Sequence, residues 1–258
     1  MFYIKTVNKF PLSLSDEIIL LLSEKPLDGS KIREVLNLFE ERDRKVVWAT
    51  LDRLVRNKLV KKDKKYGRVI FSLTKAGVEA IPKEPSFIPI PERAWDQKWR
   101  VVIFDIPEKA RSVRNHFIAR LKELGFARLQ NSVYLTVHNA FDQVKEAAQS
   151  MKILPQVKMM VVEKLFIDDW RDFAAKLWDL KNLASRYKDF LERYQNGYRH
   201  QKTDPEILKH WLKRARYEYL SILHDDPVLP KELLPPDWEG GKARELWMRL
   251  ESILKTYE

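Results

Sequence analysis

Residues 43–77 read DRKVVWATLDRLVRNKLVKKDKKYGRVIFSLTKAG, and this stretch decides the fold of the first domain. Its first part has apolar residues at helical spacing between Asp43, a suitable N-cap, and about Asn57. These residues are Val47, Leu51, Leu54 and Val55. Two segments typical of strands follow, joined by a lysine-rich tip that turns at Gly67, and Thr74 caps a further helix. The stretch therefore predicts a helix, a two-stranded hairpin and the start of another helix.

Two more helices are expected upstream of this stretch. Ser15 precedes DEIILLLSEK and is expected to cap the first helix, which Pro26 ends. Asp28 or Ser30 is expected to cap the second helix, KIREVLNLF. Three helices followed by a hairpin are typical of a winged helix-turn-helix domain, which we place at residues 1–82. Such a domain binds DNA or, in some proteins, another protein.

The positive charge of the chain is concentrated in the same region. Between Arg42 and Arg68 there are eleven Lys or Arg and three Asp, an excess of eight in a chain whose net charge is +11. A generally basic, soluble protein would spread these charges, whereas a surface that binds a polyanion gathers them. We therefore expect the third helix to enter the major groove of DNA and the wing to hold the phosphate backbone.

The expected DNA-binding residues lie on this helix and on the wing. They are Arg44, Lys45, Trp48, Arg53, Arg56, Lys61, Lys62, Lys64, Lys65 and Arg68. Lys45, Arg53 and Arg56 are the expected readers of base edges, because Arg and Lys pair with guanine. Trp48 either packs against the neighbouring helix or contacts a sugar or a thymine methyl group.

The composition limits the other classes of protein. At 258 residues the chain is long enough for two or three domains, and an apolar content of 45% is sufficient for packed cores. Cysteine is absent, which excludes disulfides, thiolate zinc sites and Cys nucleophiles and favours a reducing, cytoplasmic location. No run approaches the ~18 apolar residues of a membrane-spanning helix, and no signal peptide is expected. Walker-type, glycine-rich nucleotide and serine-nucleophile motifs are missing.

A second domain follows a proline-rich segment. Residues 82–91, PKEPSFIPIP, contain four prolines and favour a stiff, extended linker, which we place at residues 83–97. Strand and helix patterns then alternate in the order WRVVIFDIP, KARSVRNHFIARLKELG, FARLQ, SVYLTV, FDQVKEAAQSM and VKMMVVEKLFI. This order predicts a ferredoxin-like βαββαβ domain at residues 98–167, with both helices on one face of the sheet. The open face is expected to dimerise or to pack against another domain.

Residues 168–258 have a helical pattern and are expected to form a C-terminal all-α domain. Helices are expected in WRDFAAKLWDL, in NLASRYKDFLERYQNG, in PEILKHWLKRARYEYLSILHDD with Pro205 in its first turn, and after Gly240. The whole chain is therefore predicted to be an α+β multidomain protein.

Several motifs carry a family resemblance. FDIPEKAR, LKELGF and LQNSVYL resemble the ferredoxin-like CRISPR spacer-acquisition endonuclease family. Because they lie between a winged helix and a helical region, the whole chain more closely resembles the PaaX family, the repressors of phenylacetate degradation. DPVLPKELLPPDWEGG resembles the PaaX C-terminal signature, which matches at Pro235, Pro236, Asp237, Trp238 and Gly240. Packing of the turn is the preferred role of Trp238.

The two resemblances imply different ligands. The PaaX resemblance implies an aryl-acetyl coenzyme A thioester as effector, which releases the repressor from DNA. Its phosphates would need cations, or else these cations form a solvated helix face; the candidates are Arg199, His200, Lys209, Lys213, Arg214 and Arg216. The CRISPR-type resemblance implies a metal-dependent endonuclease with Asp105 as a magnesium ligand. The preferred interpretation of Asp105 is a cap of the turn before Pro107.

The sequence favours a regulator over an enzyme. His116 and His138 have no acid at short spacing and are expected at a surface or an interface, so no catalytic residue is assigned. We expect a cytoplasmic, homodimeric, sequence-specific DNA-binding transcriptional repressor, in which two winged helices read an inverted repeat of double-stranded DNA. The alternatives are the CRISPR-associated-type endonuclease and a structural DNA-binding adaptor that responds to no small molecule.

Overall fold

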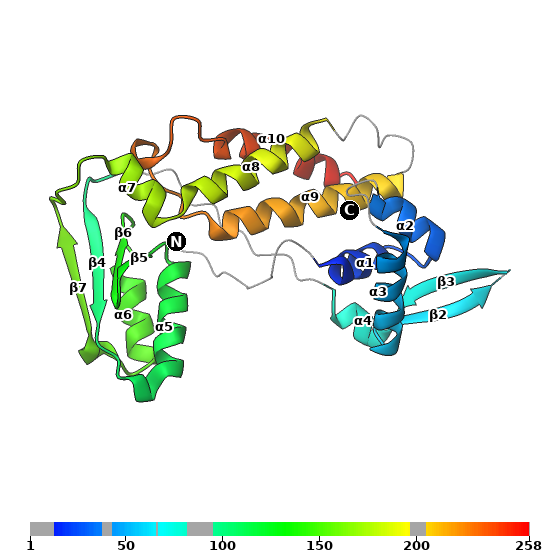
Figure 1. Ribbon diagram of the computed structural model, residues 1–258, viewed down its shortest axis with the longest axis horizontal. Coiled ribbons are helices and arrows are strands. Elements are labelled where there is room, and N and C mark those ends of the chain that lie inside the picture. The colour runs from blue at the N-terminus through cyan, green and yellow to red at the C-terminus, as the bar shows by residue number, and fades with distance from the viewer. Residues whose placement is uncertain (1–12, 38–42, 66, 82–94, 197–204, 258) are drawn as a thin grey trace. The chain divides into compact units, whose positions relative to one another are not determined.

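The structure is a computed structural model that describes residues 13–37, 43–65, 67–81, 95–196 and 205–257 (Figure 1). The chain forms two compact units, and each unit collects segments that are distant in the sequence. Within the described residues, the hairpin unit contains 13–81, 187–223 and 240–257, and the four-strand unit contains 95–186 and 224–239. Most of the linker predicted at 83–97 lies outside the described residues. The predicted domain boundaries stay predictions.

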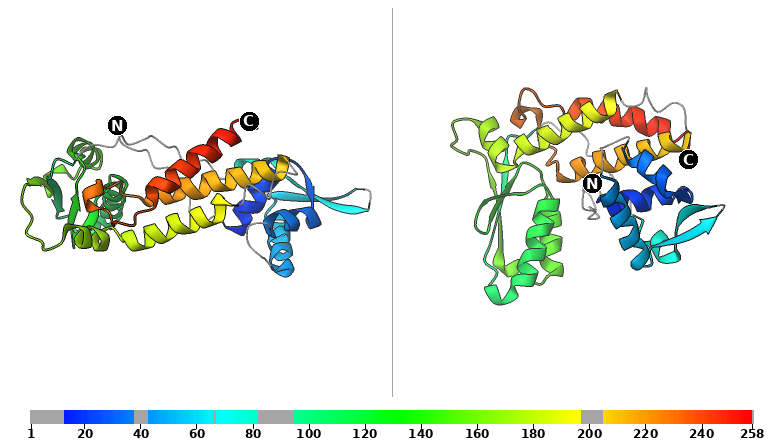
Figure 2. Two further views of the ribbon diagram at one scale, coloured as in Figure 1. Left: turned by 90° about the horizontal axis from the view of Figure 1, so that it is seen from above. Right: turned by 45° about the vertical axis from the view of Figure 1, so that its right-hand side comes forward.

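In the hairpin unit, three helices precede a two-stranded hairpin, and a short strand between the first two helices completes its antiparallel sheet (Figure 2). The elements are α1 (Leu14–Leu22), β1 (Leu27–Asp28), α2 (Gly29–Asn37), α3 (Arg44–Arg56), β2 (Val60–Lys65), β3 (Arg68–Leu73) and α4 (Lys75–Glu79). The strands have the spatial order β1–β3–β2. Gly67 has a φ of +75°, which an L side chain rarely adopts, and it turns the chain between β2 and β3. The predicted order of helix, hairpin and helix is confirmed.

Side-chain caps explain where these helices begin. As predicted, the Asp43 carboxylate accepts a hydrogen bond from the first turn of α3 at 2.7 Å, and the Thr74 hydroxyl caps α4 at 3.0 Å. The prediction that Ser15 caps α1 is wrong, because Ser13 is the cap. Asp16 lies three residues after Ser13 and accepts a hydrogen bond from the Ser13 backbone N–H, which completes a reciprocal capping box.

Three long helices follow the four-strand region in sequence, and two of them contribute to both units. They are α8 (Leu180–Gln195), α9 (Pro205–Asp225) and α10 (Gly240–Leu254). In the hairpin unit, aromatic rings join them, with the Tyr219 and Trp247 centroids 4.8 Å apart and the Tyr194 and Trp211 centroids 5.2 Å apart. The core of these helices includes Tyr187, Phe190, Trp211, Leu212, Tyr219 and Leu220, which are all buried.

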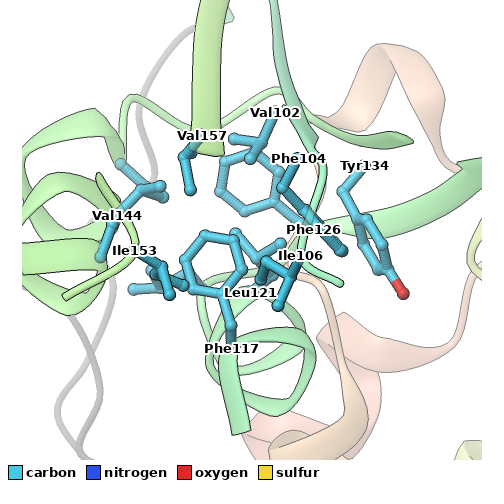
Figure 3. Close-up of a cluster of buried hydrophobic side chains, with 13 residues drawn as sticks. Val102, Phe104, Ile106, Phe117, Leu121, Phe126, Tyr134, Val144, Ile153 and Val157 are labelled. Atoms are coloured by element: carbon cyan, nitrogen blue, oxygen red, sulfur yellow. The ribbon is translucent and has the colours of Figure 1, made fainter. Parts of the chain in front are cut away.

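The four-strand unit has the predicted order of strand, helix, strand, strand, helix and strand. Its elements are β4 (Trp99–Phe104), α5 (Arg111–Glu123), β5 (Ala127–Gln130), β6 (Val133–Thr136), α6 (Phe141–Ser150), β7 (Val157–Val162) and α7 (Trp170–Leu177). The strands are antiparallel and have the spatial order β5–β6–β4–β7. Helices α5 and α6 cover one face of this sheet (Figure 1). The core between these helices and the sheet is shown in Figure 3, where Phe104, Phe117 and Leu121 meet.

The opposite face of the sheet is only partly covered. Near the start of β4, the fully buried Trp99 ring stacks on Trp170 at 5.6 Å and meets the edge of Phe173 at 5.8 Å, so that α7 packs there. Farther along the same face, Ile103 and Met160 are 36% and 42% exposed. Part of the sheet face that does not carry α5 and α6 is therefore apolar and accessible to solvent within this unit.

Candidate nucleic-acid interface

Helix α3 separates apolar from cationic side chains. Val47, Leu51 and Leu54 are buried in the core of the hairpin unit. The predicted DNA-binding residues Arg44, Lys45, Arg53 and Arg56 are all exposed. The amphipathic spacing of the sequence therefore places four cations on the solvent side of one helix.

One of these cations is held in place by another helix. The Arg53 guanidinium donates a hydrogen bond from Nη2 to the Ser15 hydroxyl of α1 at 2.6 Å. Arginine has five N–H donors, so this bond leaves others for a phosphate or a guanine edge. Nothing in the sequence indicated the contact, because the two residues are 38 positions apart.

Trp48 is used for packing. Its ring meets the edge of Phe71 with centroids 5.8 Å apart, and it is half-buried. It also lies so close to Gly29 that a Cβ added there would come within 2.4 Å of the Trp48 ring. Of the two roles considered for Trp48, the structure supports packing against a neighbouring helix.

The hairpin carries the other cations on both of its faces. Lys61, Lys62, Lys64 and Arg68 are exposed, and Lys65 lies opposite Arg68 in the strand register. Lys62 extends over the Phe71 ring, with Nζ 5.9 Å from the centroid. Lys61 lies 3.7 Å from Asp63, but both side chains are largely in water, where such a pair contributes little. The hairpin therefore presents its positive charge to solvent.

Arg68 also influences the start of α2. The Asp28 carboxylate accepts hydrogen bonds from the Ser30 hydroxyl and from the Lys31 backbone N–H, the latter at 3.1 Å. These bonds, together with the nearby Arg68 charge, lower the pKa of Asp28 below its ordinary value. The Asp28 carboxylate therefore stays ionised where it caps α2. Asp28 was one of the two caps predicted for this helix, with Ser30 as the other.

Asp105, His116 and His138 of the central region each donate a hydrogen bond to a backbone carbonyl. Asp105 is exposed after β4, and its backbone N–H donates to the Gln156 carbonyl at 3.0 Å. In the described part of the chain, no three His, Cys, Asp or Glu side chains gather as metal ligands would. His116 donates from Nδ1 to the Ser112 carbonyl at 2.8 Å, and His138 donates from Nε2 to the Pro227 carbonyl at 2.7 Å. Nothing in this arrangement supports the endonuclease alternative.

The cations of α9 are engaged within the protein. Lys209 and Lys213 form ion pairs with Glu24, and Arg214 forms one with Glu17. Arg216 binds both carboxylate oxygens of Glu251 at 2.8 Å. The expectation of a solvated helix face is therefore wrong for these four residues. Arg199 and His200, the other two candidates, lie outside the described residues.

A separate hollow of about 610 Å³ lies in the four-strand unit. Trp95 and Trp170 form its aromatic corner, with centroids 5.4 Å apart. Four carboxylates and two cations complete the charged lining; they are Glu163, Asp168, Asp169, Glu232, Lys164 and Arg171. Because acids outnumber bases, this hollow does not suit a polyphosphate.

The fold and this surface define the class of protein. It is a mixed α/β protein with two antiparallel sheets and a helical C-terminal region, and it presents a cationic helix and hairpin. Among its described helices, none has the length and apolar content needed to cross a membrane.

Comparison with known proteins identifies the family. Residues 92–174 match the family model of the PaaX protein central Cas2-like domain, and residues 178–257 match that of the PaaX-like protein C-terminal domain. The chain belongs to the PaaX family, as its motifs suggested. Regulators of this family bind DNA, so membership indicates a transcriptional regulator.

A solved structure with a distant likeness to this chain is also known. An uncharacterized protein of Mycobacterium tuberculosis, Rv0674, is 21% identical, with a TM-score of 0.48 over 95% of this chain and 97% of that one. A search of the curated proteins found no match.

Proposed function

We propose that this protein is a sequence-specific DNA-binding repressor of transcription that acts in the cytoplasm as a homodimer. Residues 13–81 are proposed to be a winged helix-turn-helix domain, and residues 98–167 a ferredoxin-like domain. The observation that carries the proposal is the exposure of the cations on α3 and on the β2–β3 hairpin, next to each other in one small fold.

The proposed mechanism follows from this arrangement. Helix α3 enters the major groove, where Lys45, Arg53 and Arg56 reach base edges. The lysines of the hairpin and Arg68 neutralise phosphates and release condensed counterions, which supplies affinity without sequence preference. Two copies related by a two-fold axis read an inverted repeat whose half-sites lie about one helical turn, or a multiple of it, apart.

Selection from random duplexes tests this function. The full chain is incubated with a pool of random double-stranded DNA, and the bound fraction is recovered by gel shift over several rounds. We expect a palindromic consensus to emerge. Recovery of unrelated sequences, at affinities that depend only on salt, would count against sequence-specific repression and favour a structural DNA-binding adaptor.

The effector is a separate proposal that rests on the family. An aryl-acetyl coenzyme A thioester is proposed to release the protein from the selected duplex. The α9 cations are already in ion pairs, so a phosphate-bearing effector that bound to them would have to displace an internal carboxylate. Titration of phenylacetyl coenzyme A against the protein–DNA complex, with free coenzyme A as control, tests this point; release by the thioester alone is the expected result.

A further inference from the structure

Helix α1 is buried on two sides. On one side, Ile18, Leu21 and Leu22 pack into the core that also contains the buried face of α3. On the other side, Leu20 forms a buried contact with Tyr217 of α9. Helix α9 therefore covers a face of α1 that a free-standing domain would leave in water.

Two carboxylates flank Leu20. Glu17 lies on α1 three residues before Leu20, and Glu24 lies just beyond the end of α1 at Leu22. Glu17 Oε1 is 2.8 Å from Arg214 Nη1, and these two side chains are only 4% and 9% exposed. A carboxylate that is buried to this extent is costly without a cation beside it, so the position of α1 depends on Arg214.

Glu24 strengthens the same contact. Its Oε2 is 3.0 Å from Lys209 Nζ, and its other oxygen binds Lys213. Burial opposes ionisation of Glu24, but the hydrogen bonds and charges of the two lysines outweigh burial and lower the pKa of this carboxyl. Glu24 is therefore ionised at neutral pH beside the two lysines.

The other end of the same helix holds a proposed base reader. Ser15 lies two residues before Glu17 on α1, and its hydroxyl accepts the hydrogen bond from Arg53 of α3. Arg214 of α9 therefore contacts Glu17, and Arg53 contacts Ser15 two residues earlier, so the backbone of α1 connects the two contacts. A side chain fixed before binding loses less conformational entropy on the DNA.

We infer that α9 positions the DNA-reading side chain Arg53, with Arg214 acting through Glu17 and Ser15. This inference rests on the proposed function and deepens it, because it gives the C-terminal helical region a part in sequence recognition. Without Arg214, Glu17 loses its ion pair with α9, α1 shifts, and the Ser15 hydroxyl moves away from Arg53. Arg53 then loses its fixed orientation although no DNA-contacting residue has changed.

The test compares specificity rather than folding. Anisotropy titrations of the full chain measure the ratio of affinities for the selected duplex and for a scrambled one. We expect Arg214→Gln and Ser15→Ala each to lower this ratio at least tenfold, and Arg214→Lys to restore most of it. Arg216→Gln is the matched control, since it breaks a buried ion pair of the same helix that faces Glu251 instead of α1. Its ratio should stay within twofold of the parent value.

A double-mutant cycle connects the two ends of the series. If Arg214 acts through Arg53, then Arg214→Gln lowers the ratio no further in an Arg53→Gln background. Additive losses, or an Arg216→Gln loss as large as that of Arg214→Gln, would overturn the inference. Where Arg214→Gln does not fold, Glu17→Gln breaks the same ion pair from the α1 side and replaces Arg214→Gln in the cycle with Arg53→Gln.

The outcomes separate the inference from the proposed function. If a consensus duplex is selected and Arg53→Gln lowers the ratio but Arg214→Gln does not, only the positioning role fails. If no duplex is selected, the proposed function fails and the positioning role fails with it.

Discussion

At the scale of single residues, two helices end in the same backbone conformation but with different residue types. Helices α5 and α6 are each followed by a residue in the left-handed region, Gly125 with φ +81° and Lys152 with φ +57°. Both ends are closed by a backbone hydrogen bond from the next residue, which Phe126 donates to Leu121 and Ile153 to Ala148. Glycine adopts this conformation freely, whereas lysine is strained in it.

Opposite substitutions at these two positions should therefore have opposite effects. Gly125→Ala places a Cβ within 2.9 Å of the His138 ring and forces a strained φ, so we expect a loss of at least about 1–2 kcal/mol of unfolding free energy. Lys152→Gly relieves strain and should be neutral or stabilising by up to about 1 kcal/mol. Urea unfolding of both variants measures the difference; equal destabilisation would contradict the assignment.

His210 of α9 gives the hairpin unit a specific pH dependence. It is 1% exposed, and burial, together with the nearby Arg214 and Lys213 charges, lowers its pKa to about 3 against the opposing effect of Glu24. In the unfolded chain its pKa is about 6.5. Between these values the unfolded state binds a proton that the native state does not, so stability is lost as the pH falls below about 6.5.

The slope of this loss is the measurable quantity. We expect about 1.4 kcal/mol per pH unit from His210 between about pH 6 and pH 4, and His210→Gln should remove it. Urea unfolding followed by tryptophan fluorescence at pH 7, 6 and 5 gives the slopes of parent and variant. The matched control is His138→Gln in the four-strand unit, whose pKa burial also lowers. Parallel slopes for the parent and His210→Gln would refute the prediction.

At the scale of elements, local chemistry could be predicted from the sequence and long-range pairing could not. Asp43 and Thr74 are caps because their side chains bond to backbone two or three residues away, and such signals are local. Ser15 was misassigned because two serines lie near the start of the same helix and only Ser13 has Asp16 three residues later. The partners of Lys213 and Arg214 lie about 190 residues earlier, so no spacing rule could find them.

The hairpin and α3 should contribute to DNA binding in different ways. Replacing Lys61, Lys62 and Lys64 with Gln should weaken binding to all duplexes alike and reduce the slope of log affinity against log salt by about 2–3. Arg56→Gln should instead reduce discrimination against the wrong base by about 1–3 kcal/mol. Anisotropy titrations at several salt concentrations separate the two effects.

Three exposed lysines of the four-strand unit serve as the matched control for charge. Replacing Lys109, Lys122 and Lys145 with Gln removes the same charge and should leave the salt slope unchanged. If this triple variant reduces the slope as much as the hairpin variant does, net charge rather than the hairpin governs binding, and the groove assignment is wrong.

At the scale of the whole molecule, the open face of the four-strand sheet concerns the proposed dimer. Met160 lies opposite Val101 in the strand register, so Met160, Val101 and Ile103 share one face, and both Ile103 and Met160 are exposed. The order of strands and helices predicted that both helices would cover one face and that the open face would dimerise or pack against another domain. The packing of α7 against Trp99 was not predicted, because tryptophans on separate elements carry no sign of being neighbours.

A charge on this face should dissociate the dimer. Met160→Glu would bury a carboxylate in the dimer contact, so we expect light scattering to show the 30.7 kDa monomer where the parent shows twice that mass. The variant should bind an isolated half-site as the parent does but lose affinity for the full palindrome. Lys145→Glu on α6 is the control and should remain dimeric; a monomeric parent would exclude this dimer.

Because α9 covers one face of α1, the N-terminal segment cannot be cut from the chain without exposing buried groups. A fragment ending at residue 81 would expose Leu20 and leave Glu17 and Glu24 without the three cations that neutralise them. Residues 13–81, with the cationic helix and hairpin, therefore cannot be transferred as an independent domain. A chimera that exchanges this segment between relatives must exchange the matching surface of α9 as well. The two segments are expected to change together in evolution although more than a hundred residues separate them.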